Sequence, residues 1–135
     1  MQIQPYLFFD GRCEEAAEFY QAALGAEVAM VLRYKDAPPG EMPVDPTKSE
    51  KIMHMALRIG GAMVLCSDGH CTGKPEFKGF GLSLTAIDAA EAARMFAALS
   101  AGGQVQMPLA KTFFAPVFGM VTDKFGVMWM VLTEA

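Results

Sequence analysis

His54 and Arg58 are the residues whose types and spacing most directly suggest chemistry on a small molecule. The run Ile52–Ile59 alternates so that His54, Ala56 and Arg58 share one face while the other face is apolar. The apolar face is expected to meet a helix, so His54 and Arg58 are predicted to face a groove or solvent. An imidazole exchanges protons near neutral pH, which makes His54 a candidate general acid or base. The alternative is a structural histidine held by hydrogen bonds.

A second set of candidate metal-binding side chains lies at the end of the next apolar run, Ala62–Ser67, and just after it. It consists of Cys66, Asp68, His70 and Cys71. Thiolate, carboxylate and imidazole groups are ligands of zinc or copper. Their spacing matches no familiar zinc pattern, however, and Asp, Gly and His together also describe an ordinary polar turn. Cys66 is a candidate for ligand contact, but as a nucleophile it would need a lowered pKa, and no paired base is visible in the sequence.

Aromatic side chains supply the remaining candidates for ligand contact. Their rings bury a large area, and Tyr and Trp keep a polar group. The 11 methionines could form a compliant pocket or fill gaps in the core. Phe118 is a further aromatic that could line a groove. The predicted ligand-binding residues are Tyr6, Phe8, His54, Arg58, Cys66, Phe114 and Trp129.

The elements that must position these residues begin with a strand, a helix and three strands. Strands are predicted over Gln2–Phe9 and Glu27–Tyr34, with a helix over Glu14–Leu24 that ends at Gly25. The proline-rich stretch Asp36–Glu50 is predicted to be a loop, either a lid or a connector. A hairpin completes the series, with strands Ile52–Ile59 and Ala62–Ser67 around Gly60–Gly61.

A second series repeats this order. It predicts a strand over Phe80–Ala86 and a helix over Ala89–Ala101, which Asp88 and Glu91 begin as a reciprocal capping pair. At one fixed offset the two series align Leu7 with Leu84, Phe19 with Phe96, Gly25 with Gly102 and Val28 with Val105. The predicted fold is therefore α+β, with duplicated βαβββ modules that form a concave mixed β-sheet groove with flanking helices. Repeat one is expected at about 1–68 and repeat two at about 80–135.

Composition narrows the classes of protein that are compatible with this pattern. The 135 residues, 53% of them hydrophobic and 19% charged, suit one packed domain over 1–135. A net charge of −4 without a basic cluster argues against nucleic acid as a partner. No apolar run is long enough for a membrane helix, and no targeting signal is visible. Three cysteines form no disulfide framework, so a cytoplasmic location is expected.

Four motifs occur in order along essentially the whole chain. They are Pro5–Phe9, Glu15–Tyr20 with Gly25–Ala26, Met53–Leu57 with Ile59–Gly61, and Phe118–Trp129. Together they resemble the PhnB-like branch of the glyoxalase/bleomycin-resistance (vicinal oxygen chelate) superfamily. The resemblance implies a paired βαβββ fold, usually a homodimer, whose concave sheet holds a small-molecule ligand and often a divalent metal.

The metal-dependent members of that superfamily place His, Glu or Gln ligands on strands one, four, five and eight. The corresponding strands here offer Tyr6 and Phe8, Leu65 and Cys66, Ser83 and Thr85, and Trp129 and Met130. The usual nitrogen and oxygen donors are absent from this set, so no divalent metal and no other cofactor are predicted.

Three functions are compatible with the sequence. A metal-independent module that binds a small molecule requires only an aromatic cleft and a dimer, and it is the preferred interpretation. The alternative is a lyase or isomerase acting on a small oxygenated metabolite, with His54 as acid or base. The third is a protein whose apolar surface serves association alone.

Overall fold

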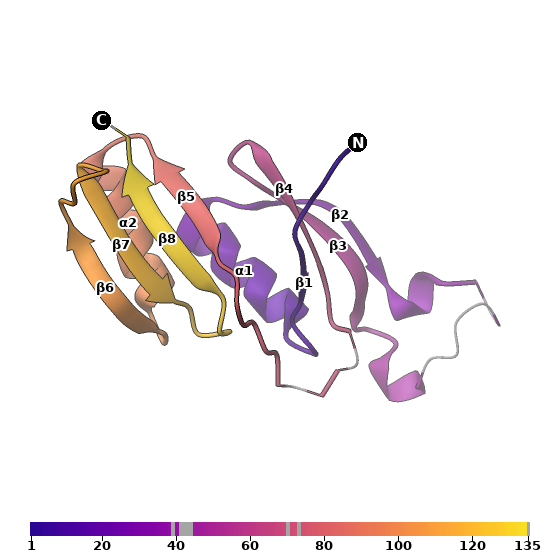
Figure 1. The fold of residues 1–135 in the computed structure, drawn as a ribbon. Helices are drawn as coiled ribbons and strands as arrows, with labels where there is room; N and C mark the ends of the chain where they lie inside the picture. The colour runs from indigo at the N-terminus through magenta and orange to yellow at the C-terminus, as the bar shows by residue number, and fades with distance from the viewer. Residues whose placement is uncertain (39, 41–44, 70, 73, 135) are drawn as a thin grey trace. The chain divides into compact units, whose positions relative to one another are not determined.

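The computed structural model describes residues 1–38, 40, 45–69, 71, 72 and 74–134. The chain forms two compact units, Met1–Pro75 and Glu76–Ala135. Each unit is built as a strand, a helix and three further strands around one four-stranded mixed sheet (Figure 1). The predicted α+β fold of duplicated βαβββ modules is confirmed, whereas the groove between the modules stays a prediction.

The first unit has the sheet order β1-β4-β3-β2. Strand β1 runs parallel to β4, and the other neighbours are antiparallel. The hairpin strands have the predicted bounds, while β1 is shorter than predicted and starts at Tyr6. The elements are β1 (Tyr6–Phe8), α1 (Cys13–Leu24), β2 (Glu27–Arg33), β3 (Ile52–Ile59) and β4 (Ala62–Ser67).

Helix α1 starts and ends for identifiable physical reasons. Its N-cap residue, Arg12, makes no side-chain cap. The backbone N–H of Cys13 instead donates to Oδ1 of the buried Asp68 at 2.8 Å, so the segment after β4 fixes the start of the helix. Gly25 ends the helix in the left-handed conformation with φ +68, which favours glycine.

The sheet of the first unit has one covered and one open face. Leu7, Met55, Leu57 and Cys66 are buried, and α1 packs against β3 on that face. Each fully buried leucine contributes roughly 1.5–3 kcal/mol to folding. The alternate residues, including His54 and Arg58, lie on the open face, which confirms the predicted division of β3 into two faces.

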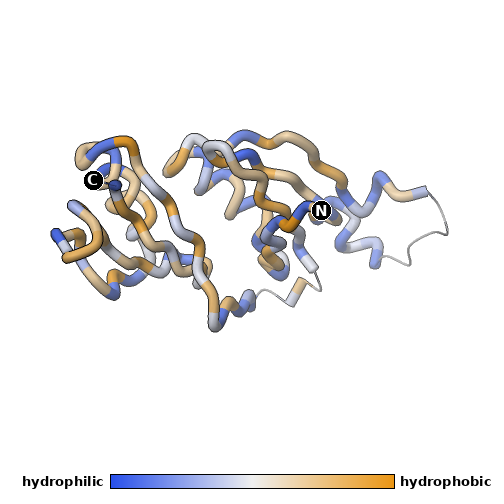
Figure 2. The backbone as a smooth tube through the Cα atoms, turned by 45° about the horizontal axis from the view of Figure 1, so that its top comes forward, coloured by the Kyte–Doolittle hydropathy of each residue, from blue (hydrophilic) through white to orange (hydrophobic). Residues whose placement is uncertain are grey.

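The second unit repeats the plan with the sheet order β5-β8-β7-β6. Its helix packs against all four strands, chiefly against β7 and β8. Figure 2 shows hydrophobic residues recurring along the strands of both units. The elements are β5 (Leu82–Ala86), α2 (Ala89–Ser100), β6 (Gln104–Ala110), β7 (Val117–Thr122) and β8 (Met128–Thr133).

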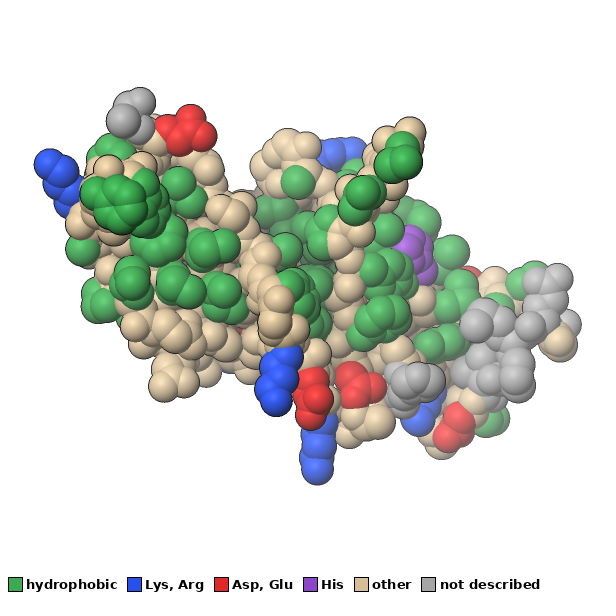
Figure 3. All heavy atoms as spheres, in the orientation of Figure 1, with side chains coloured by type: hydrophobic (Ala, Val, Ile, Leu, Met, Phe, Trp, Pro, Cys, Tyr) green, Lys and Arg blue, Asp and Glu red, His purple; other side chains and the backbone are tan. Residues whose placement is uncertain are grey.

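The open face of the second sheet is rich in methionine. Val121, Trp129 and Val131 are buried on the covered face, whereas the alternate residues of β7 and β8 are half-buried. These alternate residues are Phe118, Met120, Met130 and Leu132. Hydrophobic side chains accordingly gather over this unit in the space-filling view (Figure 3).

The start of α2 corrects one detail of the prediction. Asp88 accepts from the backbone N–H of Glu91 at 2.8 Å, as expected of an N-cap. The Glu91 carboxylate, however, accepts from the backbone N–H of Ile87 at 3.2 Å rather than from that of Asp88. The reciprocal bond therefore reaches one residue further back than a standard capping box.

The connection from β2 to β3 carries two short 3₁₀ helices, Tyr34–Asp36 and Pro46–Lys48. The carboxylate of Asp45 caps the second by accepting from the backbone N–H of Thr47 at 3.0 Å. Of the helices within the described residues, none is long and apolar enough to cross a membrane.

Candidate functional site

Tyr6 and His54 form the central contact of the open face in the first unit. Tyr6 lies on β1 and His54 on β3, with β4 between the two strands. The Tyr6 hydroxyl lies 3.0 Å from Nδ1 of His54. Their rings are stacked, with centroids 5.5 Å apart and planes 28° apart. The side chain of Tyr6 therefore reaches across the sheet to hold the imidazole.

Phe8 extends this pair into an aromatic shelf, a term we use for Tyr6, Phe8 and His54. The Phe8 ring centroid lies 4.8 Å from that of Tyr6. The ring packs beside the backbone at Gly69, where an added Cβ would meet Cδ1 of Phe8 at 3.4 Å. Phe8 is nevertheless 57% exposed, so most of its apolar surface is available for contact.

An apolar row forms the floor beside the shelf. Tyr6 lies opposite Leu65 of β4, Leu65 opposite Ala56 of β3, and Ala56 opposite Met30 of β2. Ala56 is small and buried, while Met30 is exposed. A flat ligand lying on the shelf would therefore meet hydrocarbon on this side, with methionine able to adapt to its shape.

Arg58 supplies a positive charge further along β3. Its guanidinium lies 3.6 Å from the Glu27 carboxylate, and both side chains are more than half exposed. Exposed pairs of this kind contribute little to stability, about 0–1 kcal/mol. The guanidinium could therefore exchange this partner for an anionic group of a ligand at small cost.

The Tyr6–His54 hydrogen bond determines what the imidazole can offer. If the hydroxyl donates to Nδ1, the proton of the neutral imidazole lies on Nε2, which can then donate to a ligand. If the ring is doubly protonated, Nδ1 donates to the hydroxyl oxygen instead. The pair can thus gain and lose a proton without breaking its contact, which is the behaviour required of an acid or base.

Cys66 and Trp129 lie away from the open faces. Cys66 is fully buried on the covered face, with its Sγ 3.5 Å from that of Cys13. Trp129 is buried in the second unit and donates its indole N–H to Asp123 at 2.9 Å. We therefore leave both residues out of the proposed site, although the sequence placed them among the candidates.

Phe114 belongs to an aromatic cluster in the second unit. Its ring makes edge-on contacts with Phe113 and Phe118, at centroid distances of 5.2 and 4.9 Å. The connection between β6 and β7 forms an open, shallow pocket of about 420 Å³. Its lining residues are Lys111, Thr112, Phe113, Phe114, Ala115 and Pro116. The cluster is thus an apolar surface of its own.

The predicted alternative of a zinc or copper site at Cys66, Asp68, His70 and Cys71 falls partly outside the described residues, because His70 is not among them. Asp68 accepts backbone N–H groups on both oxygens, from Cys13 and from Ile52 at 2.5 Å. Burial raises the pKa of the Cys71 thiol, which disfavours the thiolate that a metal needs. Within the described ranges no three His, Cys, Asp or Glu side chains are grouped to hold a metal.

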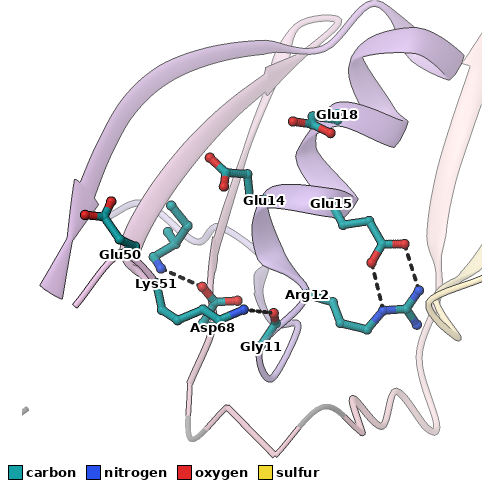
Figure 4. A pocket seen from close by; sticks show the side chains of 9 residues that line it. Gly11, Arg12, Glu14, Glu15, Glu18, Glu50, Lys51 and Asp68 are labelled. Carbon is teal, nitrogen blue, oxygen red and sulfur yellow. Dashed lines mark hydrogen bonds and ion pairs between the residues drawn. The ribbon is translucent and has the colours of Figure 1, made fainter. Parts of the chain in front are cut away.

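A separate cavity of about 320 Å³ lies beside the start of α1 (Figure 4). Arg12 forms a two-point contact with Glu15, at 3.2 and 2.9 Å, and Lys51 donates to the Gly11 carbonyl at 2.8 Å. Carboxylates outnumber cations in its wall. The lining residues are Gly11, Arg12, Glu14, Glu15, Glu18, Glu50, Lys51, Ile52 and Asp68.

Comparison with solved structures identifies the fold first. The fold resembles that of a glyoxalase-related enzyme from Fulvimarina pelagi, with a TM-score of 0.63 over 99% of this chain and 88% of that one. The two sequences are 17% identical, so this likeness concerns the fold alone. The predicted glyoxalase-type fold is confirmed.

The family follows from closer relatives. Residues 1–132 match the family described as 3-demethylubiquinone-9 3-methyltransferase, and the chain belongs to this family. Protein YjdN of Escherichia coli K12 is 37% identical over 143 residues, which cover 97% of this chain and 94% of YjdN. Together with the PhnB protein from Bacillus cereus, reported below, these matches confirm the PhnB-like branch that the motifs predicted.

Two solved structures are similar along their whole length. Protein PA1353 from Pseudomonas aeruginosa has a TM-score of 0.86 and 44% identity, covering 99% of this chain and 98% of PA1353. The PhnB protein from Bacillus cereus has a TM-score of 0.81 and 27% identity, covering 99% of this chain and all of that one.

Proposed function

We propose that this protein binds a small, planar organic molecule on the open face of its first unit. The observation that carries the proposal is the 3.0 Å contact between the Tyr6 hydroxyl and Nδ1 of His54, beside the exposed ring of Phe8. The pair presents a polar edge next to aromatic faces. A conjugated ring with one hydrogen-bond acceptor suits this arrangement, because rings stack with an offset and the acceptor can meet Nε2 of His54.

The binding is proposed to need no metal. The open-face positions of the strands that carry ligands in metal-dependent members are Tyr6 and Phe8 on β1, Leu65 on β4, Ser83 and Thr85 on β5, and Met130 on β8. Hydroxyl, thioether and hydrocarbon groups are poor ligands for divalent ions compared with imidazole and carboxylate. Apolar contact and the hydrogen bonds of Tyr6 and His54 would therefore supply the affinity.

Methyl transfer is not what we propose, despite the description of the family. A nucleotide-derived methyl donor is usually bound at a glycine-rich turn between a strand and a helix. The glycine pairs of this chain lie elsewhere: Gly60–Gly61 joins β3 to β4, and Gly102–Gly103 follows α2.

The second candidate function is acid–base catalysis by the Tyr6–His54 pair, as in a lyase or isomerase on a small oxygenated metabolite. The hydrogen bond between the two side chains is the specific observation in its favour, since Tyr6 fixes the orientation in which Nε2 meets a substrate. The same site would serve binding and catalysis, so only a measurement of turnover separates them.

We further propose that the protein acts as a homodimer. Strands β2 and β6 are edge strands with both faces exposed, including Val28, Val31, Val105 and Met107. Exposed apolar edge strands favour pairing with another chain. Light scattering after size-exclusion chromatography, with a monomer mass of 14.6 kDa, tests the dimer.

We also propose a cytoplasmic location. The three free cysteines agree with it, because thiols stay reduced in the cytoplasm.

The binding proposal is tested by a thermal-shift screen of planar organic compounds, followed by calorimetry of the hits. We expect His54→Gln and Phe8→Ala each to weaken binding several-fold in metal-free buffer. Phe113→Ala removes a fully exposed ring of the other unit and is the matched control for Phe8→Ala. Unchanged affinity in both site variants would refute the site, and loss of binding after chelation would refute metal independence.

The same hits decide between binding and catalysis. Each is incubated with the protein, and product is followed by chromatography. Turnover that His54→Gln abolishes would establish the catalytic alternative. Binding without turnover would leave the protein as a binding module.

A further inference from the structure

Cys13 and Cys66 form a buried thiol pair that the sequence does not suggest. They are 53 positions apart, Cys13 as the first residue of α1 and Cys66 on β4. Neither side chain has any exposed surface, and their sulfur atoms are 3.5 Å apart, with the Cys13 thiol donating. Cys71 is the third free thiol of the chain and is partly exposed.

We propose that Cys13 and Cys66 form an intramolecular disulfide when the protein meets a small uncharged disulfide. A disulfide bond is about 2.05 Å long, so the two sulfur atoms need to approach by roughly 1.5 Å. Asp68 holds the backbone N–H of Cys13, so this approach has to come from rotation of the two cysteine side chains and a small shift of the first helical turn. The bond would join the helix to the strand that lies between β1 and β3, the strands of Tyr6 and His54.

The acidic cavity beside the start of α1 gives an oxidant its route to the thiols. Arg12 and Glu14, the residues on either side of Cys13, line this cavity, as does Asp68, which holds the Cys13 backbone (Figure 4). Its volume of about 320 Å³ admits a small disulfide. The reagent thus reaches a point one residue from Cys13, and a small opening of the first helical turn exposes the sulfur.

The reaction is two successive thiol–disulfide exchanges. The thiolate of one cysteine attacks a sulfur of the reagent, which forms a mixed disulfide and releases one reagent thiol that takes up the proton. The second cysteine then displaces the remaining reagent thiol. The two protein thiols lose two electrons and two protons, and the reagent disulfide becomes two thiols.

Charge and protonation make this reaction selective and slow. Five carboxylates line the cavity, against Arg12 and Lys51, so an anionic disulfide such as oxidised glutathione is disfavoured. The hydrogen bond to Cys66 and burial raise the pKa of the Cys13 thiol. Only a small thiolate fraction attacks, so the rate should rise about tenfold per pH unit between pH 7 and 9.

The experiment treats the reduced full-length protein with 2-hydroxyethyl disulfide at pH 8.5. Free thiols are then alkylated under denaturing conditions, and the protein is analysed by mass spectrometry. We expect no alkylated cysteine in place of three, because the partly exposed Cys71 keeps one reagent thiol as a mixed disulfide, together with a peptide that links Cys13 to Cys66 and a higher Tm. Oxidised glutathione at the same concentration should react at least several-fold more slowly.

Two variants make the result decisive. Cys71→Ala should still form the bond and carry no reagent adduct. Cys66→Ala should form no intramolecular bond and leave Cys13 either unreacted or as a mixed disulfide with the reagent. If Cys66→Ala fails to fold, the linked peptide of the wild-type protein carries the test alone. Alkylated Cys13 and Cys66 after prolonged oxidation, or linkage through Cys71 only, would overturn the proposal.

Discussion

Trp129 donates its indole N–H to the Asp123 carboxylate at 2.9 Å, and the same carboxylate accepts the backbone N–H groups of Phe125 and Val127 at 2.9 and 3.1 Å. Asp123 is buried between β7 and β8. It therefore fixes the turn between these strands and anchors the tryptophan in the core of the second unit.

Asp123→Ala should lower the free energy of unfolding by roughly 3 kcal/mol, because three donors lose a charged acceptor. Urea unfolding followed by tryptophan fluorescence measures the change. Asp88→Ala is the matched control, since it removes an exposed carboxylate that caps α2 and should cost about 1 kcal/mol. Equal losses in the two variants would contradict the role assigned to Asp123.

Asp68→Asn should destabilise the first unit by roughly 2 kcal/mol, because one carboxylate oxygen that accepts from Cys13 or Ile52 becomes an NH₂ group that cannot accept. Amide hydrogen exchange should accelerate at those two residues. Unchanged protection at both would show that Asp68 does not hold the start of α1.

Gly103→Ala should cost roughly 2 kcal/mol or more, because the new Cβ would clash with the Thr122 carbonyl oxygen and lie 2.9 Å from Cα of Asp123, both backbone atoms. Gly61→Ala is the control, because nothing lies within 4 Å of its Cβ. Thermal unfolding of both variants compares them, and similar Tm values would be inconsistent with this close contact.

The Cys13 thiol should make the protein less stable as the pH rises above about 8.5, the ordinary cysteine pKa. Its pKa is raised in the folded state, so the unfolded chain loses the proton first, and the free energy of unfolding falls by at most about 1.4 kcal/mol per pH unit. Urea unfolding at pH 7.5 and 9.5 under reducing conditions should show a smaller decline for Cys13→Ala than for the wild type.

Tyr6→Phe should weaken binding of a screened ligand roughly 2- to 10-fold, because the imidazole of His54 loses the hydroxyl that orients it. Calorimetry measures the affinity. Tyr34→Phe is the matched control, since the Tyr34 hydroxyl donates to the Gly69 carbonyl at 3.1 Å rather than to the shelf. A loss of affinity in the control alone would place the ligand elsewhere.

Local pattern was sufficient to predict most of the fold. Alternation in β3 placed His54 and Arg58 on the open face, and the glycine pair at 60–61 set the hairpin. The early part of β1 was overpredicted, because its apolar residues resemble a strand but only Tyr6–Phe8 pair with β4.

The candidate site was harder to predict, because it depends on which residues of distant strands meet. The Tyr6–His54 contact joins positions 48 apart, and the Cys13–Cys66 contact joins positions 53 apart. Alternation says which residues share a face, but the pairing of β1 and β3 with β4 decides which of them touch. Cys66 and Trp129 were candidates because their strands were recognised while their faces were not.

Two glycines with a left-handed backbone conformation follow the two helices at aligned positions, Gly25 with φ +68 and Gly102 with φ +75. They show how the two copies can vary separately. Each copy keeps its own helix stop, while the open-face positions of the first strand differ: Tyr6 and Phe8 in one copy, Ser83 and Thr85 in the other. One copy can therefore acquire new ligand contacts by mutation while the other keeps its own surface. The repeated βαβββ plan thus provides two surfaces whose residues can vary independently on one shared framework.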